Sequence, residues 1–222
     1  TAWDWTIPEW LIIAIRKVVQ DLAVGAPDFW RSWLETRWES LFRDAVFAFA
    51  DGTTVRQPGW GVMKSGCYMT IFINTVAQMV RHNLVLARMG IPRESLETVF
   101  LGDDQTIEDF SRFDEYQELT RSLGFLLKDS VVSDRLVHFI GCVMGDNHVE
   151  LEYKDKHVFK ITHTPLAQLP DVLSSFCIWY SALPEWYEWI VMELARVSPE
   201  RVVPRRYCWD VLNKPNSVVY YW

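Results

Sequence analysis

The sequence predicts an α+β fold, with an antiparallel sheet and packed helices first and a helical portion after them. Three observations support this class. Short segments of strand composition flank turn signals such as Asp51-Gly52 and Gly145-Asp146-Asn147. Longer segments between them repeat apolar residues at helical spacing. From Pro165 onward the pattern is helical, which divides the chain into expected subdomains at 1–164 and 165–222.

Two helices and a hairpin are expected in the first quarter of the chain. Thr6 can cap a helix whose first turn holds Pro8 and Glu9, with Glu9 completing a capping box, and the apolar pattern continues to Leu22. Pro27-Asp28 opens a second helix. The hairpin strands that follow are expected at 46–50 and 53–57.

The middle of the chain is expected to hold a long helix and a second hairpin. A glycine-rich loop, 58–66, leads into the helix at 70–89, which Gly90 ends. A strand, a tight turn and another strand follow over 98–108. The remaining expected strands are 125–132, 137–144 and 148–153, and the remaining expected helices are 111–123, 166–182 and 184–197.

Composition and charge exclude several classes of protein. The 222 residues include 12 Trp and are 50% hydrophobic, which is too apolar for intrinsic disorder. Four widely spaced Cys exclude a small disulfide scaffold and a zinc knuckle. The net charge of −7 argues against a surface that binds nucleic acid everywhere, but it allows a local basic groove. No apolar run approaches the roughly 20 residues that span a bilayer, so we expect a soluble, cytosolic chain.

Two adjacent carboxylates mark the second hairpin. Gly102-Asp103-Asp104 places Asp103 and Asp104 at its tip, where the glycine permits a sharp turn. Such a pair suits hard divalent cations that keep positions open for phosphate oxygens. We therefore predict a metal site formed by Asp103 and Asp104. An ordinary solvated acidic turn is the alternative, and for this motif taken alone it would be the better interpretation.

A second pattern, S-G-x-x-x-T-x-x-x-N, spans the glycine-rich loop and the start of the long helix. Its specified residues are Ser65, Gly66, Thr70 and Asn74. Thr70 and Asn74 are four residues apart and therefore share one helix face, while Gly66 lets the backbone approach a ligand closely. The two hydroxyls, the side-chain amide and the backbone at the glycine are groups that can recognise a ribose. A glycine-containing loop with a polar helix face is the alternative.

Taken in chain order, these motifs resemble the palm of an RNA-dependent RNA polymerase from a positive-strand RNA virus. Asp4, which lies between two tryptophans, is similar to the second aspartate of palm motif A. The pattern from Ser65 matches motif B, and Gly102-Asp103-Asp104 matches motif C. The first six residues are most similar to the sobemovirus-like (solemovirus) group. The resemblance implies a palm over 1–164 and part of a thumb over 165–222.

The resemblance extends to weaker signals further along the chain. Lys128 matches the motif D lysine, and Phe139 and Cys142 belong to a hairpin similar to motif E, which grips the primer strand. A snorkelling surface lysine is an equal alternative for Lys128. Three further lysines share strand parity and would line one face against RNA phosphates, with a solvated charged edge as the alternative. They are Lys154, Lys156 and Lys160.

The resemblance implies nucleotidyl transfer in viral genome replication. The primer 3′-hydroxyl attacks the α-phosphate of an NTP with the help of two Mg²⁺ ions, for which Mn²⁺ could substitute. Asp103 and Asp104 would bind metal, and Lys128 would protonate or bind the leaving pyrophosphate. Asp4 would join the four motif B residues in the ribose pocket. The partners would be an RNA template, a primer or product strand, NTPs and the missing fingers and other polymerase segments, in a replication complex in the host cell cytoplasm.

The register of the motifs also implies that the chain is a piece of a longer polymerase. The family carries an earlier motif A aspartate, which would lie before Thr1, so we expect the isolated chain to be inactive. One alternative is a reverse transcriptase-like palm. That family typically has an aromatic residue two positions before the aspartate pair and no glycine directly before it, whereas this chain has Leu101 and Gly102. Another is a non-catalytic remnant that binds RNA or protein, against which the intact Asp4, Asn74 and Asp103 argue.

Overall fold

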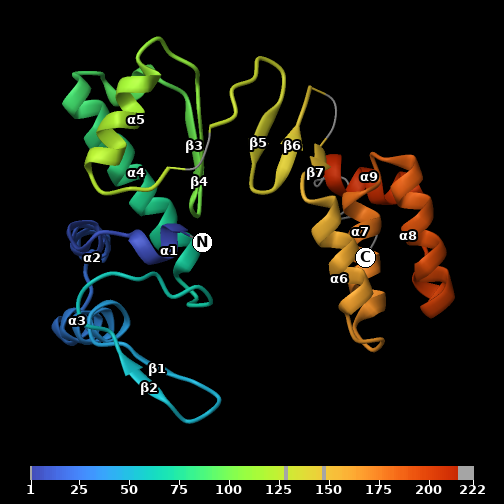
Figure 1. Ribbon diagram of the computed structural model, residues 1–222, viewed down its shortest axis with the longest axis horizontal. Coiled ribbons are helices and arrows are strands. Elements are labelled where there is room, and N and C mark those ends of the chain that lie inside the picture. The colour runs from blue at the N-terminus through green and yellow to red at the C-terminus, as the bar shows by residue number, and fades with distance from the viewer. Residues whose placement is uncertain (1, 128–129, 147–148, 215–222) are drawn as a thin grey trace. The chain divides into compact units, whose positions relative to one another are not determined.

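The computed structural model describes residues 2–127, 130–146 and 149–214. Its content of 54% helix and 11% strand agrees with the α+β class. The described strands pair only antiparallel, in sheets of order β1-β2, β3-β4 and β5-β6-β7 (Figure 1). The chain forms two compact units, Thr1–Val132 and Ser133–Trp222. This is a different division from the expected palm and thumb at 1–164 and 165–222, which stay a prediction.

The first unit contains the long helix and two hairpins that the sequence predicts. Its helices are α1 (Ala2–Thr6), α2 (Glu9–Leu22), α3 (Asp28–Phe42), α4 (Thr70–Met89), the 3₁₀ helix η1 (Arg93–Ser95) and α5 (Phe113–Ser122). Its strands are β1 (Val46–Ala48), β2 (Thr54–Arg56), β3 (Thr98–Leu101) and β4 (Asp104–Ile107). Helix α4 ends as expected, because Gly90 adopts a left-handed conformation at φ 69°.

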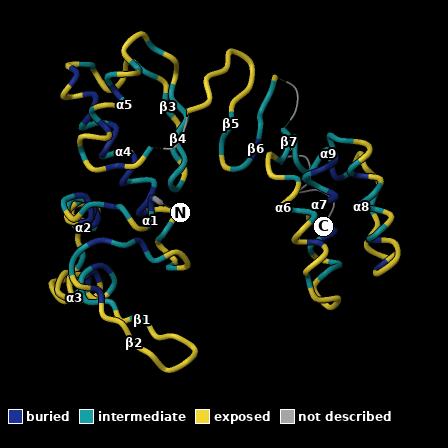
Figure 2. Tube along the Cα trace, in the orientation of Figure 1, coloured by how far each residue is buried: buried dark blue, intermediate teal, exposed yellow. Residues whose placement is uncertain are grey.

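The main core of the first unit lies between α2, α3 and α4. Leu11 and Ile12 of α2 are fully buried, and Ile73 and Ala77 of α4 pack in the same cluster. Trp38 of α3 is 2% exposed and donates its indole N–H to the Ile12 carbonyl at 3.2 Å. Figure 2 shows the buried stretches along α2 and α4. Helix α4 is therefore held rigidly by its apolar side, which leaves its other side to support the second hairpin.

The second unit combines a three-stranded sheet with a helical cluster. Its strands are β5 (Val137–Phe139), β6 (Cys142–Met144) and β7 (Val149–Leu151). Its helices are α6 (Lys154–His163), α7 (Leu169–Trp179), α8 (Pro184–Val197), the 3₁₀ helix η2 (Pro199–Arg201) and α9 (Arg205–Asn213). Leu173, Ile190 and Cys208 are fully buried where α7, α8 and α9 meet. Helix α8 has the predicted bounds because Pro184 suits a first helical position.

The expected N-terminal capping box is wrong. Thr6 is the last residue of α1, a short helix that was not expected, and therefore it cannot cap α2. Pro8 is the N-cap of α2, in an extended conformation with φ −76° and ψ 151°, and no side-chain hydrogen bond caps it. Trp3 of α1 is only 9% exposed. Packing of this residue into the core therefore decides the local conformation over the capping preference.

The strand expected at 125–132 is also wrong for its described residues, 125–127 and 130–132, which form no strand. Phe125 is 2% exposed and stacks on Trp3 with ring centroids 5.5 Å apart. It also meets the edge of Trp10 at 6.2 Å. The segment thus packs its aromatic side chain against helices instead of pairing with a sheet.

Candidate functional site

The two carboxylates lie at the β3–β4 hairpin. The register pairs Leu101 with Asp104, so Gly102 and Asp103 form a two-residue turn. Gly102 has φ 62°, a left-handed conformation that such a turn requires and that favours glycine. Asp103 and Asp104 are partly exposed. Within the part of the chain that the structure describes, the Asp103 carboxylate makes no hydrogen bond or ion pair, so it is available to a ligand.

Helix α4 holds this turn in place through two hydrogen bonds. The backbone N–H of Gly102 donates to Thr75 Oγ1 at 2.8 Å, and Gln78 Nε2 donates to the Asp103 carbonyl at 2.7 Å. Thr75 and Gln78 are three residues apart and share one side of α4. The sequence reasoning missed both residues. Their helical spacing is a weak signal in the sequence, because α4 also contains other polar residues, such as Asn74, Arg81 and His82.

A buried polar network supports the strand that follows the carboxylates. His82 Nδ1 lies 2.9 Å from the Tyr116 hydroxyl and 3.2 Å from Gln105 Nε2. Arg81 also donates to Gln105. Burial, and then the charge of Arg81, lowers the pKa of His82 to about 4. His82 is therefore neutral at neutral pH and links α4 to α5 and β4 without a buried charge of its own.

The neutral His82 makes stability depend on pH. Because its pKa falls from 6.5 to about 4 on folding, the unfolded state binds more protons between these values. The free energy of unfolding should therefore decrease by about 2–3 kcal/mol as the pH falls from 6.5 to 4, at about 1.4 kcal/mol per pKa unit. Urea unfolding across this range checks it. His82→Gln should flatten the profile relative to the exposed control His163→Gln, and identical profiles in the two variants would contradict the assignment.

The structure brings Asp4 and Ser65 together, although they are 61 residues apart in the chain. Ser65 Oγ donates to Asp4 Oδ2 at 2.9 Å. The backbone N–H of Met63 donates to the Asp4 carbonyl at 2.8 Å. The side chain and the main chain of Asp4 thus both bind the loop that precedes α4. This arrangement fixes a carboxylate beside a hydroxyl, which is a pair able to recognise a sugar hydroxyl.

Asn74 and Thr70 are engaged within the protein. Trp3 Nε1 donates to Asn74 Oδ1 at 3.0 Å, and Asn74 is 4% exposed. Thr70 Oγ1 donates to the carbonyls of Lys64 and Cys67 at 2.9 and 2.7 Å. Both side chains therefore hold the Asp4–Ser65 pair in place, Asn74 through the neighbour of Asp4 and Thr70 through the loop. Their contact with a ribose stays a prediction.

Gly66 is, with Ser65, an exposed member of the same motif. It has φ 99°, and a side chain added there would meet nothing within 4 Å. Glycine is favoured at this position because of the backbone conformation, and not because a neighbouring atom leaves no room for a side chain. The open space beside it agrees with the predicted close approach of a ligand, which stays a prediction.

The residues of the hairpin fit a hard divalent cation. Asp103 and Asp104 supply carboxylate oxygens, and Mg²⁺ is commonly bound by one or two carboxylates together with water and substrate phosphates. Among the described residues, no group of three or more His, Cys, Asp or Glu side chains is placed to hold a metal ion. The pair can therefore supply part of a coordination shell that substrate and solvent would complete.

The predicted primer-gripping residues lie on a hairpin of the second unit. β5 and β6 pair in the register Phe139↔Cys142, with a turn at Ile140-Gly141 where both residues have positive φ. This turn divides the strand expected at 137–144 into two. Phe139 is partly exposed, whereas Cys142 is 3% exposed and burial raises the pKa of its thiol. Contact of Cys142 with RNA stays a prediction.

The expected strand alignment of the three lysines is wrong. Lys154, Lys156 and Lys160 all lie on helix α6. Lys156 and Lys160 are four positions apart, so these two share a face, while Lys154 points elsewhere. Lys156 Nζ lies 3.9 Å from the Tyr153 ring centroid, and Lys154 pairs with Glu150 at 3.3 Å. The segment turns helical because Ile161 packs into the helical cluster at 8% exposure.

Two expectations remain, one for Lys128 and one for membrane-spanning segments. Lys128, the predicted motif D lysine, lies outside the described residues. In the described ranges, no helix is both long enough and apolar enough to cross a membrane.

The first unit presents paired carboxylates on one hairpin, and the loop before α4 bears a hydroxyl bound to a third carboxylate. Carboxylates are the groups with which enzymes that act on phosphates hold divalent metals. Comparison with known families gives the particular class. Residues 18–137, more than half of the chain, match the viral RNA-directed RNA-polymerase family. The chain belongs to this family, which confirms the predicted family.

One curated relative supports the same conclusion. The chain is 31% identical over 75 residues to Protein P1-P2 of Pea enation mosaic virus-1 (strain WSG). The matched segment covers 34% of this chain and 6% of that protein. The chain thus spans a small part of the relative's length. The closer similarity to the sobemovirus-like group stays a prediction.

Proposed function

We propose that this chain is the palm, over 1–164, and part of the thumb, over 165–222, of a polymerase that carries out template-directed RNA synthesis during viral genome replication. One observation carries the proposal. A single helix, α4, binds the Gly102-Asp103 turn through Thr75 and Gln78, and its N-terminal loop binds Asp4 through Ser65. Helix α4 thus connects the carboxylates suited to metal with the pair suited to a sugar.

In this proposal Asp103 and Asp104 hold two Mg²⁺ ions, or Mn²⁺ in their place, with Asp103 as the main ligand. When bound, the metal would lower the pKa of the primer 3′-hydroxyl and neutralise charge on the phosphates. The chain itself holds the turn rigid through Thr75 and Gln78. Lys128 is proposed to protonate the leaving pyrophosphate or to bind its charge.

Selection of ribose is assigned to Asp4 and to the four motif B residues, Ser65, Gly66, Thr70 and Asn74. Asp4 and Ser65 offer an acceptor and a hydroxyl to the 2′-hydroxyl of an NTP, while Asn74 and Thr70 fix their positions. A site built to bond a hydroxyl discriminates strongly, because the wrong sugar leaves its polar groups unpaired.

RNA binding is assigned to the second unit. The β5–β6 hairpin, with Phe139 and Cys142, is proposed to contact the primer or product strand. Lys156 and Lys160 share a face of α6 and would contact phosphates, whereas Lys154 is paired with Glu150 and is the weaker candidate. The template and the entry of NTPs would depend on the fingers and other segments of a longer polypeptide, in a cytoplasmic replication complex of a sobemovirus-like virus.

Incorporation assays with the full-length polymerase that contains this chain test the proposal. With an RNA template, label from NTPs should enter product, and label from dNTPs should enter poorly. Equal use of dNTPs would favour a reverse transcriptase-like palm, and no incorporation from either would favour a non-catalytic remnant. The isolated 222-residue chain should be inactive in the same assay.

A further inference from the structure

The loop that leads to Ser65 contains a strained turn. Val62 has φ 51°, a left-handed conformation that is unfavourable for a β-branched residue. The preceding Gly61 has φ 131°, and a side chain there would lie 3.3 Å from the Ile7 carbonyl. Such a backbone persists only where its surroundings hold it. The residues that hold this turn therefore determine where Ser65 lies.

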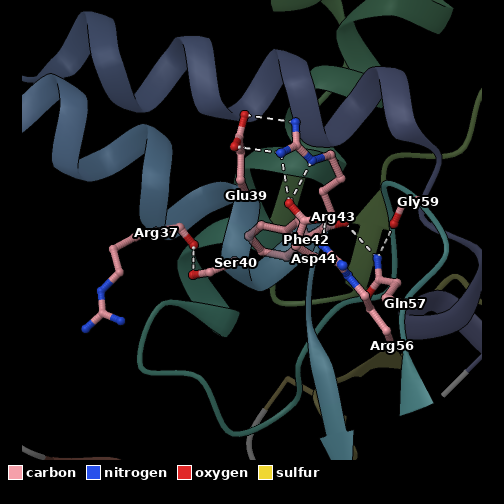
Figure 3. A network of polar contacts seen from close by, with 9 residues as sticks. All are labelled: Arg37, Glu39, Ser40, Phe42, Arg43, Asp44, Arg56, Gln57 and Gly59. Atoms are coloured by element: carbon pink, nitrogen blue, oxygen red, sulfur yellow. Dashed lines mark hydrogen bonds and ion pairs between the residues drawn. The ribbon is translucent and has the colours of Figure 1, made fainter.

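Gln57 is the first of these residues. Its side chain is 7% exposed, and its amide nitrogen lies 2.7 Å from the Phe42 carbonyl, 2.6 Å from that of Gly59 and 3.0 Å from that of Gly61. Figure 3 shows the Gln57 amide between Phe42 and Gly59. The buried amide of Gln57 thus connects the end of α3 to Gly59 and Gly61 of the glycine-rich loop.

The end of α3 is itself fixed by charged groups. Arg43 donates to both carboxylate oxygens of Glu39, at 3.1 and 2.8 Å, and to Asp44 (Figure 3). Arg56 donates to the other oxygen of Asp44 at 3.0 Å. These bonds join the end of α3 to β2, the second strand of the first hairpin. Gln57 therefore connects the strained turn to the fixed end of α3.

Lys64 is the second residue that holds the turn. Its ammonium donates to the Val62 carbonyl at 2.8 Å and to Gln57 Oε1. The ammonium also lies 5.9 Å from the Phe42 ring centroid and 5.3 Å from that of Phe47. Burial lowers the pKa of Lys64 to about 8. The side chain is thus turned into the protein, and its backbone carbonyl accepts the Thr70 hydroxyl at 2.9 Å.

We propose that Gln57 and Lys64 are positioning residues for ribose selection, because together they fix the strained Gly61-Val62 turn and hence the Ser65–Asp4 pair. The residues on either side of Lys64 carry this effect, since Met63 binds the Asp4 carbonyl and Ser65 binds the Asp4 carboxylate. The inference rests on the proposed function of Asp4 and Ser65 in recognising the NTP sugar.

The test measures kcat/KM for UTP and for 2′-deoxyUTP in the full-length polymerase. In Lys64→Met, discrimination between the two sugars should fall about tenfold, through a lower kcat/KM for UTP, because one charge-assisted hydrogen bond to the turn is lost. Gln57→Glu should give a similar fall, since a carboxylate cannot donate to the three carbonyls. Lys64→Arg should keep most of the discrimination. Lys17→Met, at an exposed lysine paired with Asp21, should change nothing.

The outcomes separate this inference from the proposed function. An equal fall in kcat/KM for both substrates would indicate a merely structural role for Lys64 and would overturn the inference while leaving polymerase function intact. A wild-type enzyme that uses neither substrate would overturn the proposed function and the inference with it. If Lys64→Met fails to fold, judged by its thermal unfolding, the milder Lys64→Gln and the Gln57→Glu variant decide the result.

Discussion

Replacing Asp103 by Asn in the full-length polymerase is expected to reduce template-directed NTP incorporation about a thousandfold or more. The substitution keeps the size of the side chain and the Gln78 bond to the Asp103 carbonyl, but it removes the charge that would hold the metal. Metal stabilisation of developing charge contributes several kcal/mol, and each 1.4 kcal/mol is about tenfold in rate. Single-turnover incorporation from a primed RNA template measures the loss.

Two further variants test whether the loss is specific to Asp103. Asp109→Asn alters an exposed aspartate that follows the same hairpin and should leave incorporation unchanged. Asp104→Asn should cause a smaller loss than Asp103→Asn, because Asp104 is the assisting ligand in the proposal. Incorporation that survives Asp103→Asn at the wild-type rate would refute the metal assignment.

Replacing Trp3 by Ala is expected to lower the free energy of unfolding by about 3–5 kcal/mol, the usual cost of removing a buried Trp side chain. Trp3 is 9% exposed and stacks on Phe125 at 5.5 Å. It also donates the hydrogen bond to Asn74. Urea unfolding of the purified protein measures the change, and the incorporation assay should show a parallel loss because Asp4 is the next residue.

A matched series separates the two contributions of Trp3. Trp3→Phe can keep the stacking on Phe125 but leaves the buried Asn74 oxygen without its donor, so it should cost about 1–3 kcal/mol. Trp5→Ala removes a neighbouring Trp that is 70% exposed, and it should change the free energy of unfolding by no more than about 0.5 kcal/mol. A loss from Trp5→Ala as large as that from Trp3→Ala would contradict the packing described for α1.

Local signals in the sequence were sufficient for several elements. The long helix has the expected bounds, Thr70–Met89, because its apolar spacing continues without interruption until Gly90 ends it with a left-handed residue. The hairpins at Asp51-Gly52 and Gly102-Asp103 also form where predicted. In each case a glycine with positive φ defines the turn, at 85° for Gly52 and 62° for Gly102. These features depend on residues that are neighbours in the chain.

Local signals failed where a distant part of the chain offered a stronger interaction. Thr6 does not cap a helix but ends helix α1, because Trp3 of α1 is buried in the core. The lysines after Leu151 were expected on a strand, but Ile161 packs into the helical cluster and α6 forms. Strand and helix patterns are hard to separate in short segments, so tertiary packing decides between them.

The chemical groups of the candidate site can be identified from the amino-acid sequence alone. They are the carboxylates of Asp103 and Asp104 and the hydroxyl of Ser65, in a motif order that matches a viral RNA polymerase. Which of these groups come into contact depends on the tertiary fold. Asp4 reaches Ser65 across 61 residues, and Thr75 and Gln78 reach the carboxylate turn across 27 and 25 residues. Such contacts depend on how α2, α3 and α4 bury their apolar faces together, and no local pattern encodes that packing.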